Sequence, residues 1–326
     1  MDTIAGFSAK GNVRFLDCHP KPADFFGEVI NGLGRECKAI PPKFFYDRAG
    51  SQLFDSICRL AEYYPTRTEV KILRDNLDDI VATVGQYCYL IEPGSGSCDK
   101  VRLMLDTLRP SAYMPLDISR DYLLDACRRL CADFPWLDVH AVCIDFTDDL
   151  DLPGSPTHLR RVAFFPGSSI GNFEPAEAVT FLRDLGLAVG LGGGVLIGVD
   201  LKKDREMLHA AYNDGEGVTA AFNKNLLTRI NGELSADFEV EAFEHMAFYN
   251  PGAGRVEMHL ESLTDQKVRI GESSFDFVRG ETIHTENSYK YNLDEFRSLA
   301  EQAGLRPVRA WTDPGNLFSV HFLDVH

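Results

Sequence analysis

The chain has 326 residues, a length that favours two domains over a single hydrophobic core. Hydrophobic residues make up 44% and charged residues 25%, as in ordinary globular proteins, and no apolar run approaches the roughly 18 residues of a membrane span. The formal net charge is −16 and no lysine- and arginine-rich cluster occurs, so a small molecule is favoured over DNA or RNA as the partner.

The N-terminus, MDTIAGFSAKGNVRF, lacks a basic flank followed by an apolar core, so no secretory signal is expected. The eight cysteines are scattered and none forms a CxxC pair. This pattern favours reduced structural thiols and no bound metal. We therefore expect a cytoplasmic protein without a membrane segment.

Strands and helices alternate through the middle of the chain. Buried strands are predicted at 87–92, 112–117, 139–146, 162–166 and 194–201. Helices are predicted at 99–108, from Ser119 to about Phe134, and at 175–189, where a proline stands in the first turn. Alternation at this spacing predicts βαβ units in a mostly parallel sheet.

The pattern changes after residue 204. Residues 205 to about 229 are predicted helical with a loop at 213–215, and short alternating runs follow up to about residue 291. Val256, Met258 and Leu260 would point one way while the residues between them point the other, as in a half-buried antiparallel strand. We interpret this block as an insertion with its own core.

The α/β pattern then returns. Asn292 can cap a helix with Glu295 in the capping-box position, and that helix would stop at Gly304. Segments 306–312 and 318–325 predict a terminal hairpin around residues 313–315. A parallel sheet finished in this way is the usual plan of a Rossmann-like methyltransferase.

A glycine-rich turn, Gly94-Ser95-Gly96, follows the first of these strands. Its glycines would let the backbone approach a ligand closely. A nicotinamide dinucleotide fingerprint requires a third glycine at position 99, where this chain has an aspartate that disfavours a phosphate. The loop therefore points away from a dinucleotide and leaves room for a zwitterionic ligand.

S-adenosylmethionine fits the acids at the next strand ends. Asp117 can accept hydrogen bonds from both ribose hydroxyls, and the pair 145–146 (Asp-Phe) suits the adenine amine and ring face. The Gly94 carbonyl or Glu92 could meet the cofactor's ammonium, and Lys100 its carboxylate. The sequence thus predicts an S-adenosylmethionine site at the carboxyl edge of the sheet.

A second turn-rich loop, 165–172, faces the same edge. It ends at Asn172, which can be read either as a helix N-cap or as an amide that faces the substrate. The loop alone leaves both interpretations open.

Six motifs in one order resemble the histidine-specific N-α-methyltransferase family of ergothioneine biosynthesis. The resemblance covers the chain from about Ile40 to the C-terminus. The motifs are PPKFFYDRAGSQLF (41–54), EYYPTRTE (62–69), EPGSGSCDKVR (92–102), FPGSSIGNF (165–173), AYNDGEGVTAAFN (211–223) and GETIHTENSYKY (280–291).

The resemblance implies three methyl transfers to the α-amine of histidine, which give its betaine, hercynine. It also implies an α/β fold, in which a Rossmann-like methyltransferase sheet (66–204 plus 290–326) accompanies a second, α+β substrate-binding lobe (1–65 plus 205–289). Because fungal relatives methylate dimethylallyltryptophan, another amino acid such as a tryptophan derivative stays an alternative substrate. We expect a monomer with no nucleic-acid partner.

The resemblance also implies the site residues. Tyr63 would lie near the α-amine as the catalytic residue, and Met258 would line the pocket. The substrate carboxylate would be held by Asn172 and Tyr212, and the imidazole by Glu286 and Ser288. The cofactor would be held by Tyr46, Gly94, Lys100, Asp117, Asp145 and Phe146.

The recognition segment departs from some relatives, which have Ile between the glutamate and the serine and Ala after them. Here these neighbours are Asn287 and Tyr289. Glu286 can accept the ring N–H and Ser288 can donate to the other nitrogen, and two residues apart on a strand they face one side. The departure therefore bears on fine substrate preference more than on the reaction.

No residue is an obvious strong base for the substrate amine. A tyrosine hydroxyl could orient the amine and relay a proton, and repulsion from a sulfonium disfavours the ammonium form. Two other function classes stay open from the sequence: a non-catalytic methyltransferase-like binding subunit, and a nicotinamide oxidoreductase, which Asp99 weakens.

Overall fold

The computed structural model describes residues 8–10, 13–18, 23–147, 150, 152 and 158–326. The chain divides into two compact units. The first unit contains Met1–His19, Pro65–Lys202 and Lys290–His326, and the second contains Pro20–Tyr64 and Lys203–Tyr289.

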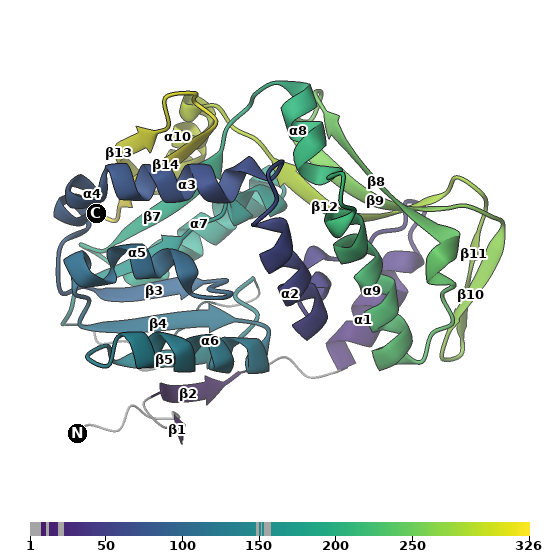
Figure 1. Ribbon diagram of the computed structural model, residues 1–326, viewed down its shortest axis with the longest axis horizontal. Helices are drawn as coiled ribbons and strands as arrows, with labels where there is room; N and C mark the ends of the chain where they lie inside the picture. Colours follow the sequence, from purple (N-terminus) through teal and green to yellow (C-terminus); the bar gives the residue numbers. More distant parts are fainter. Residues whose placement is uncertain (1–7, 11–12, 19–22, 148–149, 151, 153–157) are drawn as a thin grey trace. The chain divides into compact units, whose positions relative to one another are not determined.

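A nine-stranded sheet organises the first unit (Figure 1). Its strand order is β1-β2-β5-β4-β3-β6-β7-β14-β13. The strands are β1 (Ser8–Lys10), β2 (Val13–Asp17), β3 (Tyr89–Pro93), β4 (Ala112–Asp117), β5 (Val139–Cys143), β6 (Arg161–Phe165), β7 (Gly194–Asp200), β13 (Arg306–Thr312) and β14 (Phe318–Asp324).

The six strands from β2 to β7 in this order run parallel, and β14 and β13 close one edge antiparallel. Asp313 shapes the hairpin between β13 and β14, since its carboxylate accepts from the backbone N–H groups of Gly315, Leu317 and Phe318. The order reverses direction between β3 and β6. In open α/β sheets ligands bind at such a switch point, beyond the carboxyl ends of the strands.

Helices cover both faces of this sheet. The helices of the unit are α3 (Tyr64–Asp75), α4 (Leu77–Val84), α5 (Asp99–Leu108), α6 (Arg120–Asp133), η2 (Ser169–Asn172), α7 (Pro175–Val189) and α10 (Leu293–Gln302). Phe164 of β6 joins a hydrophobic cluster with residues of α3 to α6. Its neighbour Phe165 instead lies 4.8 Å from Phe181 of α7, ring centroid to ring centroid. Because successive strand residues face opposite sides, α7 covers the face opposite to that cluster.

The second unit combines helices with two small antiparallel sheets (Figure 1). One sheet has the order β12-β9-β8 and the other pairs β10 with β11. The strands are β8 (Phe243–Asn250), β9 (Arg255–Ser262), β10 (Gln266–Ile270), β11 (Ser273–Phe277) and β12 (Thr282–Tyr289). The helices are α1 (Ala23–Leu33), η1 (Pro42–Phe45), α2 (Arg48–Ile57), α8 (Arg205–Tyr212), α9 (Val218–Leu234) and η3 (Val240–Ala242), with α9 packed against α2, β8 and β9.

A β-bulge interrupts the pairing of β12 with β9. His284 pairs with His259 and Glu286 pairs with Met258, so Thr285 is the extra residue of the bulged strand. The Thr285 hydroxyl donates to Asn223 Oδ1 of α9 at 2.8 Å, which fixes the bulge against the helix. Side chains along a strand normally alternate between the two faces of its sheet. Across the bulge, residues three apart in sequence, such as His284 and Asn287, lie on the same face instead.

Most predicted elements are confirmed. Helices 99–108 and 175–189 and strands 112–117 and 306–312 have the predicted bounds, and Asn292 with Glu295 forms the predicted capping box. The third predicted strand is shorter than expected, since β5 ends at Cys143 and the 145–146 pair lies in the following turn. The N-terminal segment also differs from the expected division, because β2 pairs with β5 in the large sheet.

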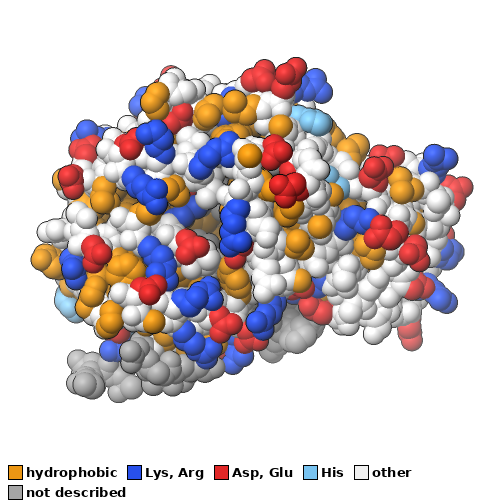
Figure 2. Space-filling model, viewed as in Figure 1, with side chains coloured by type: hydrophobic (Ala, Val, Ile, Leu, Met, Phe, Trp, Pro, Cys, Tyr) orange, Lys and Arg blue, Asp and Glu red, His pale blue; other side chains and the backbone are white. Residues whose placement is uncertain are grey.

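No helix among the described residues is long and apolar enough to span a membrane. On the face shown in Figure 2, lysine and arginine side chains are interspersed with acidic ones.

Candidate active site

The glycine turn after β3 has a backbone that side chains rarely adopt. Gly94 and Gly96 have φ angles of +66° and +52°. A Cβ atom at Gly94 would also lie 3.4 Å from the ring of Phe146. The turn therefore needs glycine for its conformation, and the ring of Phe146 lies against it.

Asp117, at the end of β4, holds this turn. Its Oδ2 accepts from the Gly96 N–H at 3.0 Å and its Oδ1 from the Ser119 N–H at 2.8 Å. Burial raises the pKa of the Asp117 carboxyl, while the backbone N–H groups of Ser119, Gly96 and Ile118 act in the opposite direction. The carboxylate thus fastens the glycine turn to the neighbouring strand end.

Asp145 is 5% exposed and shapes the turn after β5. Its Oδ1 accepts from the Thr147 N–H at 3.0 Å and from the Thr147 hydroxyl at 2.5 Å. Three of the predicted cofactor residues, Gly94, Asp117 and Asp145, therefore stand at the carboxyl ends of three adjacent strands.

Lys100 forms an ion pair that the sequence does not reveal. Its Nζ lies 2.6 Å from Oε2 of Glu69, a residue of α3 whose side chain is 1% exposed. The same carboxylate accepts from the Gly167 N–H at 2.9 and 3.0 Å. A Cβ at Gly198 would lie 2.0 Å from Glu69 Oε1, so β7 admits this carboxylate only because it carries a glycine there. Glu69 therefore joins α3, α5 and the loop after β6.

Glu92 is the other buried acid of this edge, at 1% exposure. The hydroxyl of Tyr113 donates to its Oε2. Burial raises the pKa of Glu92 well above its ordinary value, and the nearby Cys98 thiol acts in the same direction.

In the second unit the predicted aromatic residues gather in one place. The ring of Tyr63 lies 6.4 Å from those of Tyr212 and Phe54, and the ring of Tyr46 lies 5.8 Å from Phe54. Burial raises the pKa of Tyr63 well above its ordinary value, and Tyr212, Cys58, Glu286 and Tyr46 act in the same direction by electrostatic repulsion. Tyr63 is therefore a neutral phenol near neutral pH.

Asp47 fixes the loop that carries Tyr46. Asp47 is the N-cap of α2: its Oδ1 accepts from the Gly50 N–H at 2.7 Å and from Asn225 Nδ2 of α9 at 2.9 Å. A Cβ at Gly50 would clash with the carbonyl oxygen of Phe45 at 1.8 Å. The turn at the start of α2 therefore explains why the motif PPKFFYDRAGSQLF has an aspartate at 47 and a glycine at 50.

Two predicted recognition residues form a direct hydrogen bond. The Tyr212 hydroxyl lies 2.7 Å from Ser288 Oγ and donates to it, and both side chains are buried. His245 contacts the carbonyl oxygen of Tyr212 through Nε2 at 2.8 Å, which positions the end of α8 against β8. Glu286 and Ser288 share the face of β12 that carries Met258 on β9, as their pairing requires.

Asn172 is half-buried and lies in η2 of the first unit. It is not the cap of the following helix, because α7 has Glu174 as its N-cap in a capping box with Glu177. The predicted cofactor residues therefore lie in the first unit, except Tyr46, which lies in the second. The predicted substrate residues lie in the second unit, except Asn172, which lies in the first.

Sequence reasoning missed Glu69 and Asn223 as organising residues. Glu69 ends the EYYPTRTE motif and Asn223 ends AYNDGEGVTAAFN, so both were within segments that the motifs had already marked. What the motifs could not reveal is the partner of each side chain, since those partners are distant in sequence.

A family model described as "Histidine-specific methyltransferase, SAM-dependent" matches residues 25–325. The histidine N-alpha-methyltransferase of Mycolicibacterium smegmatis is 42% identical over 300 residues, covering 90% of this chain and 92% of the relative. The protein of the same name from Mycobacterium tuberculosis is 40% identical over 299 residues, with the same coverage of each. The ergothioneine biosynthesis protein 1 of Neurospora crassa is 32% identical over 310 residues, covering 88% of this chain and 33% of the relative.

The raised pKa of Glu92 predicts a pH-dependent stability. Above pH 4.5, the ordinary pKa of a glutamate, the unfolded chain releases the Glu92 proton while the folded chain retains it. The free energy of unfolding therefore falls as the pH rises from 4.5 toward the raised pKa of Glu92 in the folded chain. Glu92→Gln removes that titration. The thermal midpoint of ligand-free Glu92→Gln minus that of wild type should therefore increase from pH 4.5 to pH 8.

The matched control is Glu301→Gln, because Glu301 is exposed on α10. This variant gives the effect of removing one exposed carboxyl group over the same pH range. A difference for Glu92→Gln that rises no more than that for Glu301→Gln would contradict a raised pKa of Glu92.

Proposed function

The chain belongs to the histidine-specific, S-adenosylmethionine-dependent methyltransferases, and we propose that it transfers three methyl groups to the α-amine of L-histidine, which gives hercynine in ergothioneine biosynthesis. The family match over residues 25–325 is the observation that carries this function. The candidate site contributes what the reaction requires: a backbone turn open to a ligand, acids at adjacent strand ends, and a set of imidazole-compatible polar groups.

S-adenosylmethionine, when bound, supplies a methyl group activated by a sulfonium. The glycine turn and the strand-end carboxylates fit such a ligand, because the turn has no side chains at Gly94 and Gly96 and the carboxylates can accept from hydroxyl and amine groups. We assign the ribose to Asp117 and the adenine to the 145–146 pair.

The Gly94 carbonyl is assigned to the ammonium of the cofactor and Lys100 to its carboxylate. The ion pair with Glu69 determines where the Lys100 ammonium stands, since Glu69 is itself held by the Gly167 N–H. Tyr46 is assigned to the cofactor from the family pattern.

Histidine recognition is assigned to β12. Glu286 would accept the imidazole N–H, and Ser288, which accepts a hydrogen bond from Tyr212, can donate its own hydrogen to the other ring nitrogen. Met258 would pack beside the ring. The substrate carboxylate is assigned to Asn172 and Tyr212. Because a phenol has one hydrogen, Tyr212 would turn its hydroxyl from Ser288 to that carboxylate when the substrate binds.

The raised pKa of Tyr63 limits what this residue can do. A phenol that stays protonated near neutral pH is a hydrogen-bonding partner for the amine and not the base that deprotonates it. We therefore propose that Tyr63 directs the nitrogen lone pair toward the methyl group. In-line displacement depends on this orientation, and positioning alone can lower a barrier by several kcal/mol.

We further propose that the protein acts as a cytoplasmic monomer without a nucleic-acid partner. The net charge of −16 supports the last point, because a polyanion would be repelled at long range.

An amino-acid panel tests the function. The purified protein is incubated with S-adenosylmethionine and each amino acid in turn, and products are identified by mass spectrometry. We expect trimethylation of L-histidine and little or no turnover of tryptophan or its derivatives. Preferred turnover of an indole amino acid would support the alternative substrate, and no turnover of any member would support a non-catalytic subunit.

Glu286→Ala should weaken the use of histidine. Removing the acceptor of the ring N–H should lower kcat/KM for histidine by at least about tenfold, since an unpaired polar group costs about 1–3 kcal/mol. Cofactor affinity, measured by titration calorimetry, should stay unchanged. Glu244→Ala on the exposed face of β8 is the control, and unchanged histidine kinetics in Glu286→Ala would remove this residue from recognition.

Asp117→Ala should weaken the cofactor. It removes both the assigned ribose acceptor and the hydrogen bond that holds the Gly96 N–H, so titration calorimetry should show at least about tenfold weaker binding. Asp121→Ala is the matched control, because Asp121 lies four residues on and is 70% exposed. Equal affinity for the two variants would count against the assignment of Asp117.

A further inference from the structure

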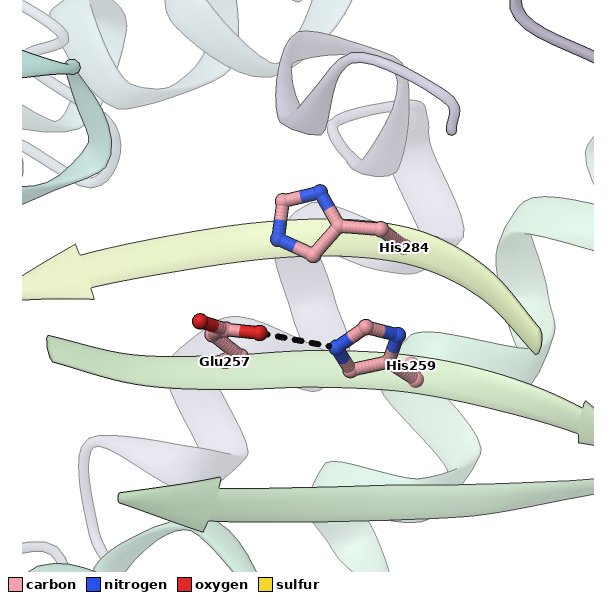
Figure 3. Close-up of side chains that lie close together, drawn as sticks. All are labelled: Glu257, His259 and His284. Atoms are coloured by element: carbon pink, nitrogen blue, oxygen red, sulfur yellow. Dashed lines mark hydrogen bonds and ion pairs between the residues drawn. The ribbon is translucent and has the colours of Figure 1, made fainter. Parts of the chain in front are cut away.

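Three potential metal ligands lie together on the three-stranded sheet of the second unit (Figure 3). Glu257 and His259 are on β9 and His284 is on β12. One donor atom from each lies within 4.8 Å of the other two, and none of the three side chains belongs to the face that carries Met258 and Glu286.

The backbone explains why these side chains meet. His259 and His284 are direct cross-strand partners, and Glu257 is two residues from His259 along the same strand, so all three project from one face. Glu257 pairs with Asn287 in the same register. The bulge at Thr285 brings Asn287 onto this face together with His284, although the two are three residues apart.

Hydrogen bonds hold the carboxylate of Glu257 in one orientation. Its Oε1 accepts from Arg255 Nε at 2.8 Å and from Asn250 Nδ2 at 2.9 Å, whereas Oε2 faces His259 Nε2 at 3.2 Å. The guanidinium of Arg255 thus occupies one oxygen and leaves the other directed at the histidines.

Each imidazole has a ring nitrogen beside a side-chain oxygen of this face. His259 Nε2 faces Glu257 Oε2 at 3.2 Å, whereas its other ring nitrogen, Nδ1, is buried and has no hydrogen-bond partner among the described residues. His284 Nε2 lies 2.9 Å from Asn287 Oδ1, so an amide oxygen stands beside the second ring.

We propose that Glu257, His259 and His284 form a binding site for one divalent transition-metal ion of the zinc type. Two imidazole nitrogens and one carboxylate oxygen are a donor set that such ions prefer over calcium or magnesium, which take oxygen ligands. Ligands about 2.1 Å from an ion are at most about 4.2 Å apart, so these donors, which lie within 4.8 Å of one another, would have to move closer by side-chain rotation when the ion binds.

The ion would tie β9 to β12 on the face opposite to Glu286 and Ser288. It would therefore stabilise the strand that bears the proposed recognition residues without entering the methyl-transfer site. The assignment needs no metal in the reaction and does not rest on the proposed function.

The test uses the full-length, untagged protein and zinc chloride. After equilibrium dialysis, bound zinc is measured by plasma mass spectrometry, and cobalt(II) replaces zinc for absorption spectra that report imidazole coordination. We expect about one zinc per wild-type chain and at least tenfold weaker binding in His259→Gln and in His284→Gln. His209→Gln is the matched control, because His209 is exposed on α8 and outside the cluster.

Circular dichroism and thermal melting of the metal-free proteins establish that the variants are folded. If they are not, Glu257→Gln, which retains side-chain size, replaces them with the same expected loss. Zinc binding that is absent from wild type, or that is equal in wild type and a folded His259 or His284 variant, would overturn the proposal.

Discussion

The first unit depends on how buried carboxyl groups at one sheet edge are satisfied. Glu69, Glu92, Asp117 and Asp145 are each no more than 8% exposed, and a buried carboxyl group without partners costs free energy in its neutral form, which burial favours for Glu92, as well as in its charged form. Each therefore has a specific partner: a lysine, a tyrosine hydroxyl or backbone N–H groups of a turn. These contacts shape the loops around the switch point of the sheet, so the same acids that could meet a ligand also build the backbone that receives it.

The second unit depends on one bulged strand. With Thr285 as the extra residue, β12 presents Glu286 and Ser288 on one face and His284 and Asn287 on the other. The first pair lies with Met258 and Tyr212, where histidine recognition is proposed. The second pair lies with Glu257 and His259, where a metal ion is proposed. The two proposed sites therefore share β12 but lie on opposite faces of its sheet.

Tyr63 illustrates how burial limits mechanism. Its environment favours the neutral phenol, which agrees with the orienting role proposed for it, and in that proposal the substrate amine reaches the reactive state through positioning and repulsion by the sulfonium. Glu92 shows the same effect in a carboxyl group. In both cases the chemistry of the site follows from desolvation as much as from the identity of the residue.

The sequence by itself determined the alternation of strands and helices, the glycine turn, the strand-end acids and the family, because these depend on local periodicity and contiguous motifs. Only the tertiary structure decided the pairing of β2 with β5, the insertion of Glu69 beside Gly198, the bulge at Thr285 and the meeting of His259 with His284. Each of these joins residues far apart in the chain. Register between strands is set by packing across the sheet, which a local pattern of alternating residues does not specify.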